Sequence, residues 1–567
     1  MLTAGSTVDT RPLYDVRAAM RDGVELSADV FLPGNGSGPW PAIVFRTPYD
    51  NASTEVVRLG LLFSEHGYAF VAQDVRGRGD SDGLFVPFRR EGQDGYDTVE
   101  WVAQQAWCDG TVGTAGGSYS AVAQWLAARE RPPHLRAIAS AASPGRWMEE
   151  LPYLFGTFSS HWLNFLNVTS GRTMQHPLYA PRAPLPDYPA IRQHRPFRDL
   201  PLRLGRRLPV WDEWLAHPSY DDYWQALSLE DDFAALDVPA LHITGWFDYN
   251  QRGQLFYWAG MGGSPAAAQQ WLVVGPWDHA GTRHPQRELC GRDFGRQSLV
   301  DLGDLHVRFF DRFLKGDEEA WSAEPRVRAF AMGANDWRSY DAWPPPASRE
   351  RPFYLRSGGA ANTALDDGRL TAEPPGQEPP DRYVYSPDDP TPSYPSLTDQ
   401  DEKNRPIEIG WRLDRDDTLV YTTDPLEQPL HVAGIPILVL HAESDCIDTD
   451  WHAQLCEVTP GGRCDELATA CLRAAYRHGR DAVPTPIVPG EIIEYRLEFT
   501  AVETIFLPGT SLRLCIASAD YPRRTQNPNT NAPTGDDDAC VPAQNAVHHD
   551  AAFPSRLLLP LLAPEGR

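Results

Sequence analysis

Ser118 lies in the glycine-rich stretch "GTAGGSYSAVAQW", whose residue types suit a serine that acts as a nucleophile. A nucleophilic serine on a sharp strand-to-helix turn needs glycine or another small residue two positions before and after it, so that strand and helix can approach closely. Gly116 and Ser120 meet this requirement. The pattern is short, and an ordinary glycine-rich loop also satisfies it, so other residues must decide between the two interpretations.

Two side chains further along the chain supply the groups that such a serine requires. A histidine with a pKa near 6.5 can take and return the hydroxyl proton, and a carboxylate on its other ring nitrogen fixes the tautomer. Asp248 follows the apolar segment "ALHITGWF", and His279 ends the segment "WLVVGPWDH". Serine, aspartate and histidine thus occur in the order of hydrolases with this turn, and we predict that they form a catalytic triad.

Other residues compete for these roles. Asp278 directly precedes His279, but neighbouring side chains at a strand end point apart, which favours Asp248 as the acid. His284 lies in the same loop as His279 and is the lesser candidate for the base, whereas His242 lies inside a strand and is predicted to be a core residue. A serine–lysine mechanism is disfavoured, because neither of the two lysines follows a predicted strand near a candidate serine. They are Lys315 and Lys403.

The elements that must position these residues follow an α/β pattern. Apolar strands such as "PAIVFRTPYD" run into polar loops, and "EGQDGYDTVEWVAQQ" has the periodicity of an amphipathic helix. An aromatic-rich and proline-rich stretch interrupts the pattern, which later resumes, and alternating strands with Pro, Gly and Asp turns follow. We predict a parallel-sheet core with covering helices, an inserted cap and a C-terminal antiparallel sandwich or jelly roll. The expected bounds are 1–144 and 238–324 for the two parts of the core, 145–237 for the cap and 325–567 for the jelly-roll-like domain.

Composition limits the partners. The 567 residues carry a formal net charge of -26, which disfavours nucleic acid and membrane surfaces, so a small-molecule substrate is expected. No apolar run is long enough to cross a bilayer and the first residues do not resemble a signal peptide, from which we expect a cytoplasmic protein. The eight cysteines show no CxxC pair, which favours reduced thiols and no metal or other cofactor. A homo-oligomer remains open.

Six segments carry a resemblance to a known family. They are "RDGVELSADVFLP", "RTPYDN", "AFVAQDVRGRGDSDGLF", "AWCDGTVGTAGGSYSAVAQW", "GWFDYN" and "GPWDHAG". Together with the C-terminal β module, they resemble the bacterial cocaine esterase and X-prolyl dipeptidyl-peptidase family of serine hydrolases. The resemblance implies that Ser118 is the nucleophile, His279 the base and Asp248 the acid. It also implies an oxyanion hole formed by the Tyr49 hydroxyl and the Tyr119 backbone N–H. The fold that it implies is an α/β-hydrolase core with an inserted helical cap and a C-terminal β jelly-roll domain.

We therefore expect a serine hydrolase that cleaves an ester or amide of a small hydrophobic or aromatic acid through an acyl-enzyme. An X-Pro dipeptidyl aminopeptidase or an α-amino acid ester hydrolase is the alternative, and it needs cap carboxylates to bind the substrate ammonium. The acidic candidates are Glu149, Glu150, Asp221 and Asp222. An acyltransferase of secondary metabolism could use the same acyl-enzyme, and a binding protein with an inactive hydrolase core is the non-enzyme alternative.

Overall fold

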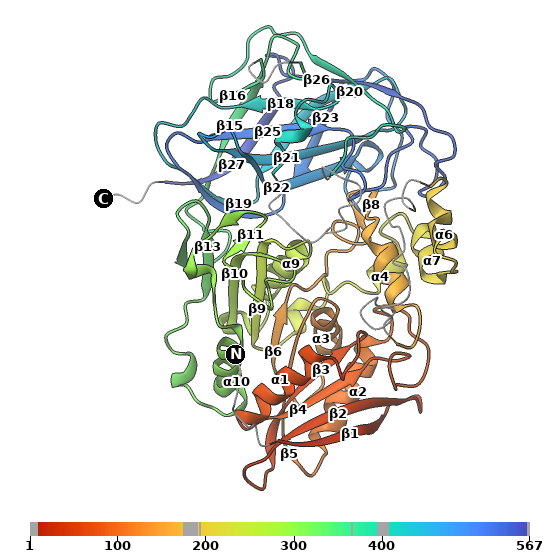
Figure 1. The fold of residues 1–567 in the computed structure, drawn as a ribbon, viewed down its shortest axis with the longest axis vertical. Helices are drawn as coiled ribbons and strands as arrows, with labels where there is room; N and C mark the ends of the chain where they lie inside the picture. Colours follow the sequence, from red (N-terminus) through yellow and green to blue (C-terminus); the bar gives the residue numbers. More distant parts are fainter. Residues whose placement is uncertain (1–9, 174–190, 192–193, 364–366, 394–407, 564–567) are drawn as a thin grey trace.

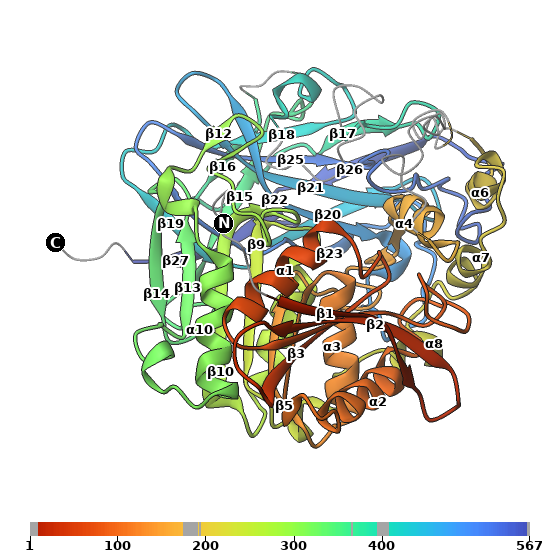
Figure 2. The same cartoon turned by 60° about the horizontal axis from the view of Figure 1, so that its bottom comes forward.

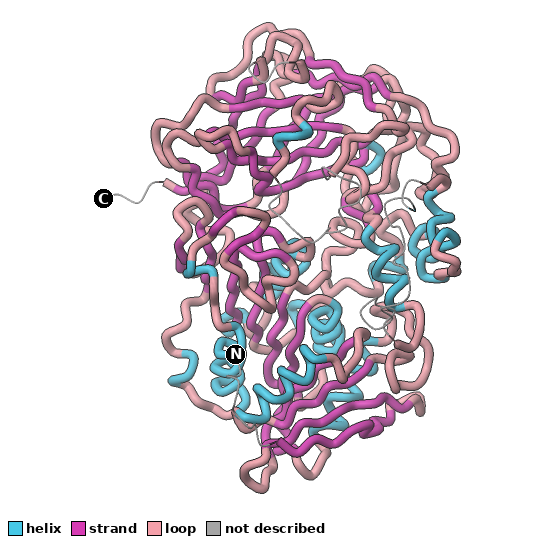
Figure 3. The backbone as a smooth tube through the Cα atoms, viewed as in Figure 1, coloured by secondary structure: helices cyan, strands magenta, loops and turns pink. Residues whose placement is uncertain are grey.

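The computed structural model describes residues 10–173, 191, 194–363, 367–393 and 408–563. Figure 1 shows two stacked parts, with the α/β part below and an all-β module above, and with cap helices along one side of the α/β part. The tube in Figure 3 makes the same division visible, because strands dominate the upper part while most helices lie in the lower part and the cap. The architecture is an α/β hydrolase with a C-terminal β domain, as predicted.

The α/β part is built on one sheet with the strand order β1-β2-β4-β3-β5-β6-β9-β10-β13-β14. Its strands are β1 (Thr10–Ala19), β2 (Glu25–Pro33), β3 (Trp40–Thr47), β4 (Ala69–Asp74), β5 (Cys108–Gly117), β6 (Leu135–Ala141), β9 (Ala240–Phe247), β10 (Gln270–Asp278), β13 (Val327–Ala331) and β14 (Asp336–Tyr340). The strands from β4 to β13 in this order run parallel, and the outer ones are antiparallel. Their carboxyl ends therefore meet along a single edge.

Helices cover both faces of this sheet (Figure 2). They are α1 (Thr54–Glu65), α2 (Glu91–Ala103), α3 (Tyr119–Arg129), α9 (Gln251–Met261) and α10 (Leu302–Leu314). Helices α1 and α10 share one hydrophobic cluster with the sheet, whereas α2 and α3 contribute to clusters on the other face. Helix α3 is buried almost all round, which its small alanines permit, because they let it pack deep between sheet and cap.

The cap lies between β6 and β9, where the interruption was predicted. Its described elements are the hairpin β7 (Tyr153–Leu154) and β8 (Thr157–Phe158) and the helices α4 (His161–Thr169), α6 (Leu200–Arg203), α7 (Pro209–Ala216) and α8 (Asp222–Gln225). Most of the aromatic side chains of the cap are buried in one cluster and form its own core. These include Trp147, Tyr153, Phe158, Trp162, Phe165, Trp211 and Trp214.

The C-terminal module is a network of mainly antiparallel strands. Its described strands are β15 (Arg349–Arg356), β16 (Arg369–Thr371), β17 (Asp381–Tyr385), β18 (Leu419–Thr422), β19 (Leu430–Gly434), β20 (Ile437–Ser444), β21 (Asp450–Val458), β22 (Cys464–Arg473), β23 (Ile493–Glu498), β24 (Val502–Phe506), β25 (Ser511–Ala517), β26 (Ala543–His548) and β27 (Arg556–Leu562). The short hairpin β11 (Glu288–Leu289) and β12 (Arg292–Asp293) lies in the preceding segment.

The core sheet extends beyond the predicted boundary at residue 324. Strand β13 pairs with β10 in parallel, and β14 pairs with β13, so the hydrolase sheet continues to Tyr340. The reason is burial: the apolar side of "VRAFA" joins the cluster that holds the ends of β9 and β10. An alternating strand pattern does not reveal which of two neighbouring sheets the strand joins.

All eight cysteines are free thiols, and five of them are buried. In the described part of the chain, no three His, Cys, Asp or Glu side chains are grouped as metal ligands. The helices that the structure describes include none with the length and apolar character needed to cross a membrane.

Candidate active site

Five polar side chains follow the carboxyl ends of neighbouring parallel strands. Tyr49 follows β3, Asp74 ends β4, Ser118 follows β5, Asp248 follows β9 and His279 follows β10. Ligand chemistry in open parallel sheets gathers at this edge. The fold thus assembles, at one end of the sheet, residues that are up to 230 positions apart in the numbering of the chain.

Ser118 occupies a strained turn between β5 and α3. Its φ of 59° and ψ of -123° lie in a region that side chains rarely adopt, and its N–H donates to the Ala141 carbonyl over 2.8 Å. A Cβ on Gly116 would lie 2.7 Å from the Ser120 Cβ, and the φ of Gly116 is +149°. Glycine at 116 and a small residue at 120 are therefore what this turn requires, which explains the G-x-S-x-S pattern.

Tyr119 anchors the turn from the buried side. Its hydroxyl donates to Glu91 Oε1 over 2.8 Å and accepts from the Phe88 N–H over 2.9 Å, while its ring stacks on that of Phe88. The backbone N–H of Tyr119 begins helix α3, where the first N–H groups have no partner within the helix. That N–H is free to serve as an oxyanion donor beside Ser118.

Asp248 and His279 form a buried pair. Asp248 Oδ1 lies 2.8 Å from His279 Nδ1, and both side chains are almost fully enclosed. The Thr244 hydroxyl and the Asn250 N–H also donate to the carboxylate, which holds it in place. Burial lowers the pKa of His279 to about 4, although Asp248 acts in the opposite direction, so the imidazole is neutral at pH 7 and able to accept a proton.

The competing residues have other partners. Asp278 Oδ1 accepts from the Gly281 N–H over 2.7 Å and thereby shapes the loop after His279. His242 is fully buried and its two ring nitrogens lie 2.9 Å from the Gln254 amide and 3.0 Å from the Gln270 amide, as a core residue would. His284 is largely exposed.

Two tyrosine hydroxyls approach the Ser118 side chain. Ser118 lies near enough to Tyr49 and Tyr249 to lower the pKa of both phenols, against the larger effect of burial. Burial raises the pKa of Tyr49 to about 12, so its phenol keeps its proton at neutral pH and can donate. Tyr249 also stacks on the His279 ring, with centroids 4.1 Å apart. Sequence reasoning found Tyr49 but missed Tyr249, although its position in "GWFDYN", next to Asp248, was a usable signal.

The loop that carries Tyr49 is held by the segment after β4. Asp74 accepts from the Asn51 N–H over 2.9 Å, and burial raises its pKa to about 7. Arg78 donates to the carbonyl of Pro48 over 2.7 Å and to that of Thr169 in the cap over 2.9 Å. Hydrogen bonds therefore join the motifs "RTPYDN" and "DVRGRGDS", and the buried Arg78 connects the Tyr49 loop to the cap.

The acidic cap residues that could bind an ammonium group are mostly engaged elsewhere. Glu149 pairs with Arg146 over 2.8 Å. Glu150 is buried and accepts from three backbone N–H groups, and burial raises its pKa to about 7. Asp221 caps helix α8 and lies 2.6 Å from His217, while Asp222 is exposed.

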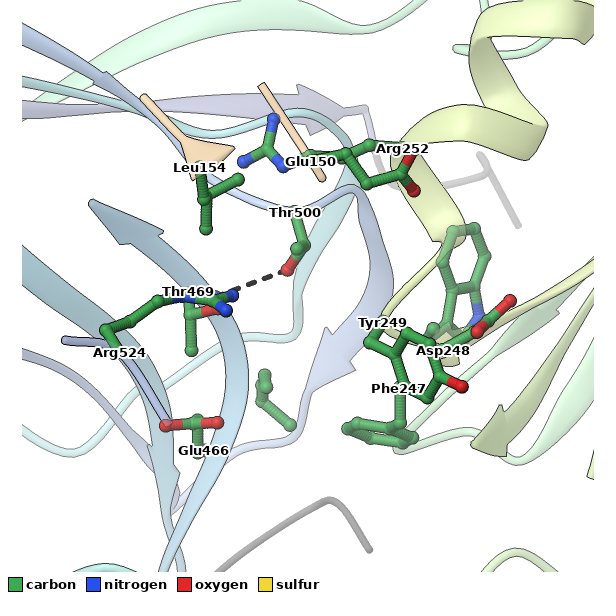
Figure 4. A pocket seen from close by; sticks show the side chains of 12 residues that line it. Glu150, Leu154, Phe247, Asp248, Tyr249, Arg252, Glu466, Thr469, Thr500 and Arg524 are labelled. Atoms are coloured by element: carbon green, nitrogen blue, oxygen red, sulfur yellow. Dashed lines mark hydrogen bonds between the residues drawn. The ribbon is translucent and has the colours of Figure 1, made fainter. Parts of the chain in front are cut away.

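A small polar cavity lies behind the catalytic edge, between the core and the β module (Figure 4). Asp248 and Tyr249 face it from one side, and Glu466 and Arg524 from the other. Its volume of about 30 Å³ is room for roughly two water molecules, and its lining includes neither Ser118 nor His279. Ser118 itself is half-buried.

Comparisons with known proteins match both parts of the chain. The family profile described as X-Pro dipeptidyl-peptidase (S15 family) matches residues 22–281, and that of the X-Pro dipeptidyl-peptidase C-terminal non-catalytic domain matches residues 319–558. Cocaine esterase from Rhodococcus sp. (strain MB1 Bresler) is 34% identical over 577 aligned positions, which cover 97% of this chain and 98% of the esterase.

Solved structures share the complete architecture. An aminopeptidase from a marine sediment Thaumarchaeota archaeon superposes with a TM-score of 0.87 at 25% identity, covering 98% of this chain and 97% of its own. An α-amino acid ester hydrolase superposes with a TM-score of 0.86 at 26% identity, covering 99% and 98% of the two chains. The similarity thus extends over core, cap and β module together.

Proposed function

Since this chain belongs to the X-Pro dipeptidyl-peptidase (S15) family of serine hydrolases, we propose that it hydrolyses carboxylic esters through an acyl-enzyme on Ser118. His279 takes the hydroxyl proton as Ser118 attacks the carbonyl carbon, and then returns that proton to the leaving alcohol. In the second half of the reaction, water attacks the acyl-enzyme with His279 as the base. The acid is released, and His279 returns the proton to Ser118. Asp248 holds the imidazole and stabilises its charged form during both steps.

The observation that carries this proposal is the strained Ser118 turn at the same sheet edge as the buried Asp248–His279 pair. The tetrahedral intermediate bears a negative oxygen, and two donors are available for it at the turn: the Tyr119 N–H and the Tyr49 hydroxyl. A donor directed at that oxygen in a site with little water contributes about a hundredfold or more to the rate. Ester substrates are favoured because a relative that is 34% identical over 97% of this chain is a cocaine esterase.

Intact mass after treatment with a fluorophosphonate tests the nucleophile. We expect one adduct on the wild type and none on Ser118→Ala, and a loss of several orders of magnitude in ester turnover in that variant with the fold retained. His279→Ala should lose both labelling rate and turnover. An adduct of equal yield on Ser118→Ala would contradict the assignment.

An aminopeptidase or α-amino acid ester hydrolase is a second candidate, because two structures with those activities share the whole architecture. Such an activity needs a carboxylate for the substrate ammonium, and Glu149 and Glu150 already have partners. Turnover of alanyl-proline p-nitroanilide, compared with p-nitrophenyl butyrate, separates the two. An acyltransferase would reveal itself by products formed with an added alcohol or amine.

A further inference from the structure

Arg283 lies against the Ser118 turn. It follows His279 by four residues, in a helical turn in which the Arg283 N–H donates to the Ala280 carbonyl over 3.0 Å. A Cβ on Gly117 would lie 2.9 Å from Arg283 Nη1 and 3.2 Å from its Cδ. The guanidinium therefore rests on the glycine that directly precedes the nucleophile, and a side chain at this position would displace it.

The hydrogen-bonding capacity of this guanidinium is unused. Nη1 is buried without a hydrogen-bond partner among the described residues. Arg283 forms an ion pair in which Nε lies 3.7 Å from Glu55 Oε1. This distance is longer than that of a charge-assisted hydrogen bond, and the Arg283 and Glu55 side chains are 28% and 49% exposed. Arg78, on the other side of Tyr49, differs because it donates to two carbonyls.

The charge of Arg283 acts on the reacting groups. It lowers the pKa of Tyr49, Tyr249 and His279, in each case as a smaller contribution than that of burial. A positive charge that reaches all three side chains lies close to the space that the substrate carbonyl must enter. Arg283, Gly117 and Ser118 are each half-buried, so all three retain exposed surface.

A carboxylate is the ligand that fits these observations. An arginine guanidinium presents its N–H groups in a planar fork that matches a carboxylate, and a buried N–H without an acceptor is costly until an anion supplies one. The chain as a whole carries a net charge of -26, so an anionic substrate needs a local cation near the nucleophile.

We propose that Arg283 binds a carboxylate carried by the substrate, and that the enzyme therefore selects acidic esters or amides. This inference rests on the proposed function of Ser118 and names the substrate class for it. The carboxylate belongs to the acyl group or to the leaving group, and both cases place it within reach of the same guanidinium.

The test compares kcat/KM for matched esters that differ by one negative charge. For the acyl side the pair is p-nitrophenyl hemiglutarate and p-nitrophenyl valerate, and for the leaving-group side it is 4-acetoxybenzoate and phenyl acetate. In Arg283→Gln we expect the acidic-to-neutral ratio to fall at least tenfold for one of the pairs. Arg283→Lys should keep part of the preference, because it keeps the charge without the fork. Added salt should weaken the preference in the wild type.

Arg287→Gln is the matched control, because it removes the same charge from the same loop at a side chain that pairs with Asp293 and is 52% exposed. We expect its ratios to equal those of the wild type. A fall in one pair assigns the carboxylate to the acyl group or to the leaving group. Unchanged ratios for both pairs in Arg283→Gln, or an equal fall in Arg287→Gln, would overturn the proposal.

Failure of this inference differs from failure of the proposed function. If Ser118 is not the nucleophile, either the wild type takes no fluorophosphonate label, or label and ester turnover persist in Ser118→Ala. If only the role of Arg283 is wrong, the wild type is labelled and hydrolyses the neutral esters, but the ratios do not depend on residue 283.

Discussion

At the scale of single residues, the site depends on hydroxyl groups held beside one serine. Tyr49 and Tyr249 both approach Ser118, yet they differ in what else they do. Tyr49 lies on the loop that Arg78 and Asn51 fasten, whereas Tyr249 stacks on the imidazole of His279. The contacts of the first loop hold Tyr49, the proposed oxyanion donor, in place. The stacking of Tyr249 supports His279, the proposed base.

The Tyr49→Phe substitution should lower kcat for a p-nitrophenyl ester by about 100-fold to 1000-fold with little change in KM, because an oxyanion donor acts mainly in the transition state. Tyr249→Phe keeps the ring on His279 and should cost less than Tyr49→Phe. Steady-state kinetics of both variants measure the difference. The oxyanion role belongs to Tyr249 instead if its substitution proves the more damaging of the two.

At the scale of elements, a buried histidine joins several strands of the β module. His549 follows β26, and its ring nitrogens lie 2.9 Å from Asp381 Oδ2 and 3.2 Å from Glu378 Oε2. Tyr421 on β18 and Ser357 after β15 also donate to Asp381. Burial lowers the pKa of His549, but the two carboxylates outweigh burial and raise it above 6.5, so the ring is charged at mildly acidic pH.

This cluster makes the stability of the module depend on pH. Because the folded pKa of His549 is above its unfolded value, its contribution is complete below pH 6.5 and is lost as the pH rises through the folded pKa. His549→Gln leaves the buried Asp381 without its cation, whereas Glu378 keeps Arg356, and the loss should cost about 3 kcal/mol at pH 6 and less at pH 9. Urea unfolding at both pH values measures this. The exposed His478→Gln is the control, and a cost independent of pH would contradict the assignment.

The site and this cluster differ in how far the sequence could predict them. Ser118, Asp248 and His279 could be found because each follows an apolar strand, and the parallel order of those strands brings their ends together. His549 and Asp381 are 168 positions apart on antiparallel strands, where no short motif marks them. Arg283 was missed for another reason: only the folded chain shows that its guanidinium lies against Gly117, with Nη1 buried and without a hydrogen-bond partner among the described residues.

At the scale of the whole molecule, the α/β part and the β module form one packed body. A single hydrophobic cluster runs from the ends of β9, β10 and β13 into the strands of the module, with Trp246 and Phe330 on the hydrolase side and Leu438 and Leu497 on the other. This continuity is the physical reason that the boundary at residue 324 could not be placed from strand patterns alone. It also predicts that the catalytic part without the module would expose a large apolar face.

One carboxylate connects three parts of this body. Glu498, at the end of β23, accepts from Arg146 at the start of the cap and from Arg252 on helix α9, each over 2.6 Å. Arg252 also donates to the backbone carbonyl of Glu498 over 2.6 Å, and its guanidinium is almost fully buried. Helix α9 begins three residues after Asp248, so this junction supports the element next to the acid of the site.

The Glu498→Gln substitution should therefore weaken the whole assembly. It removes the counter-charge of Arg252 and one of the two carboxylates that pair with Arg146, and because Glu498 is 31% exposed we expect a cost of about 2 kcal/mol rather than that of a fully buried pair. The midpoint temperature of thermal unfolding should fall by several degrees, and esterase activity should be lost at a correspondingly lower temperature. Glu494→Gln is the matched control on the same strand, since Glu494 is 48% exposed and lies 3.4 Å from His441. Equal midpoints for the two variants would mean that apolar packing, and not this carboxylate, holds the cap, helix α9 and the β module together.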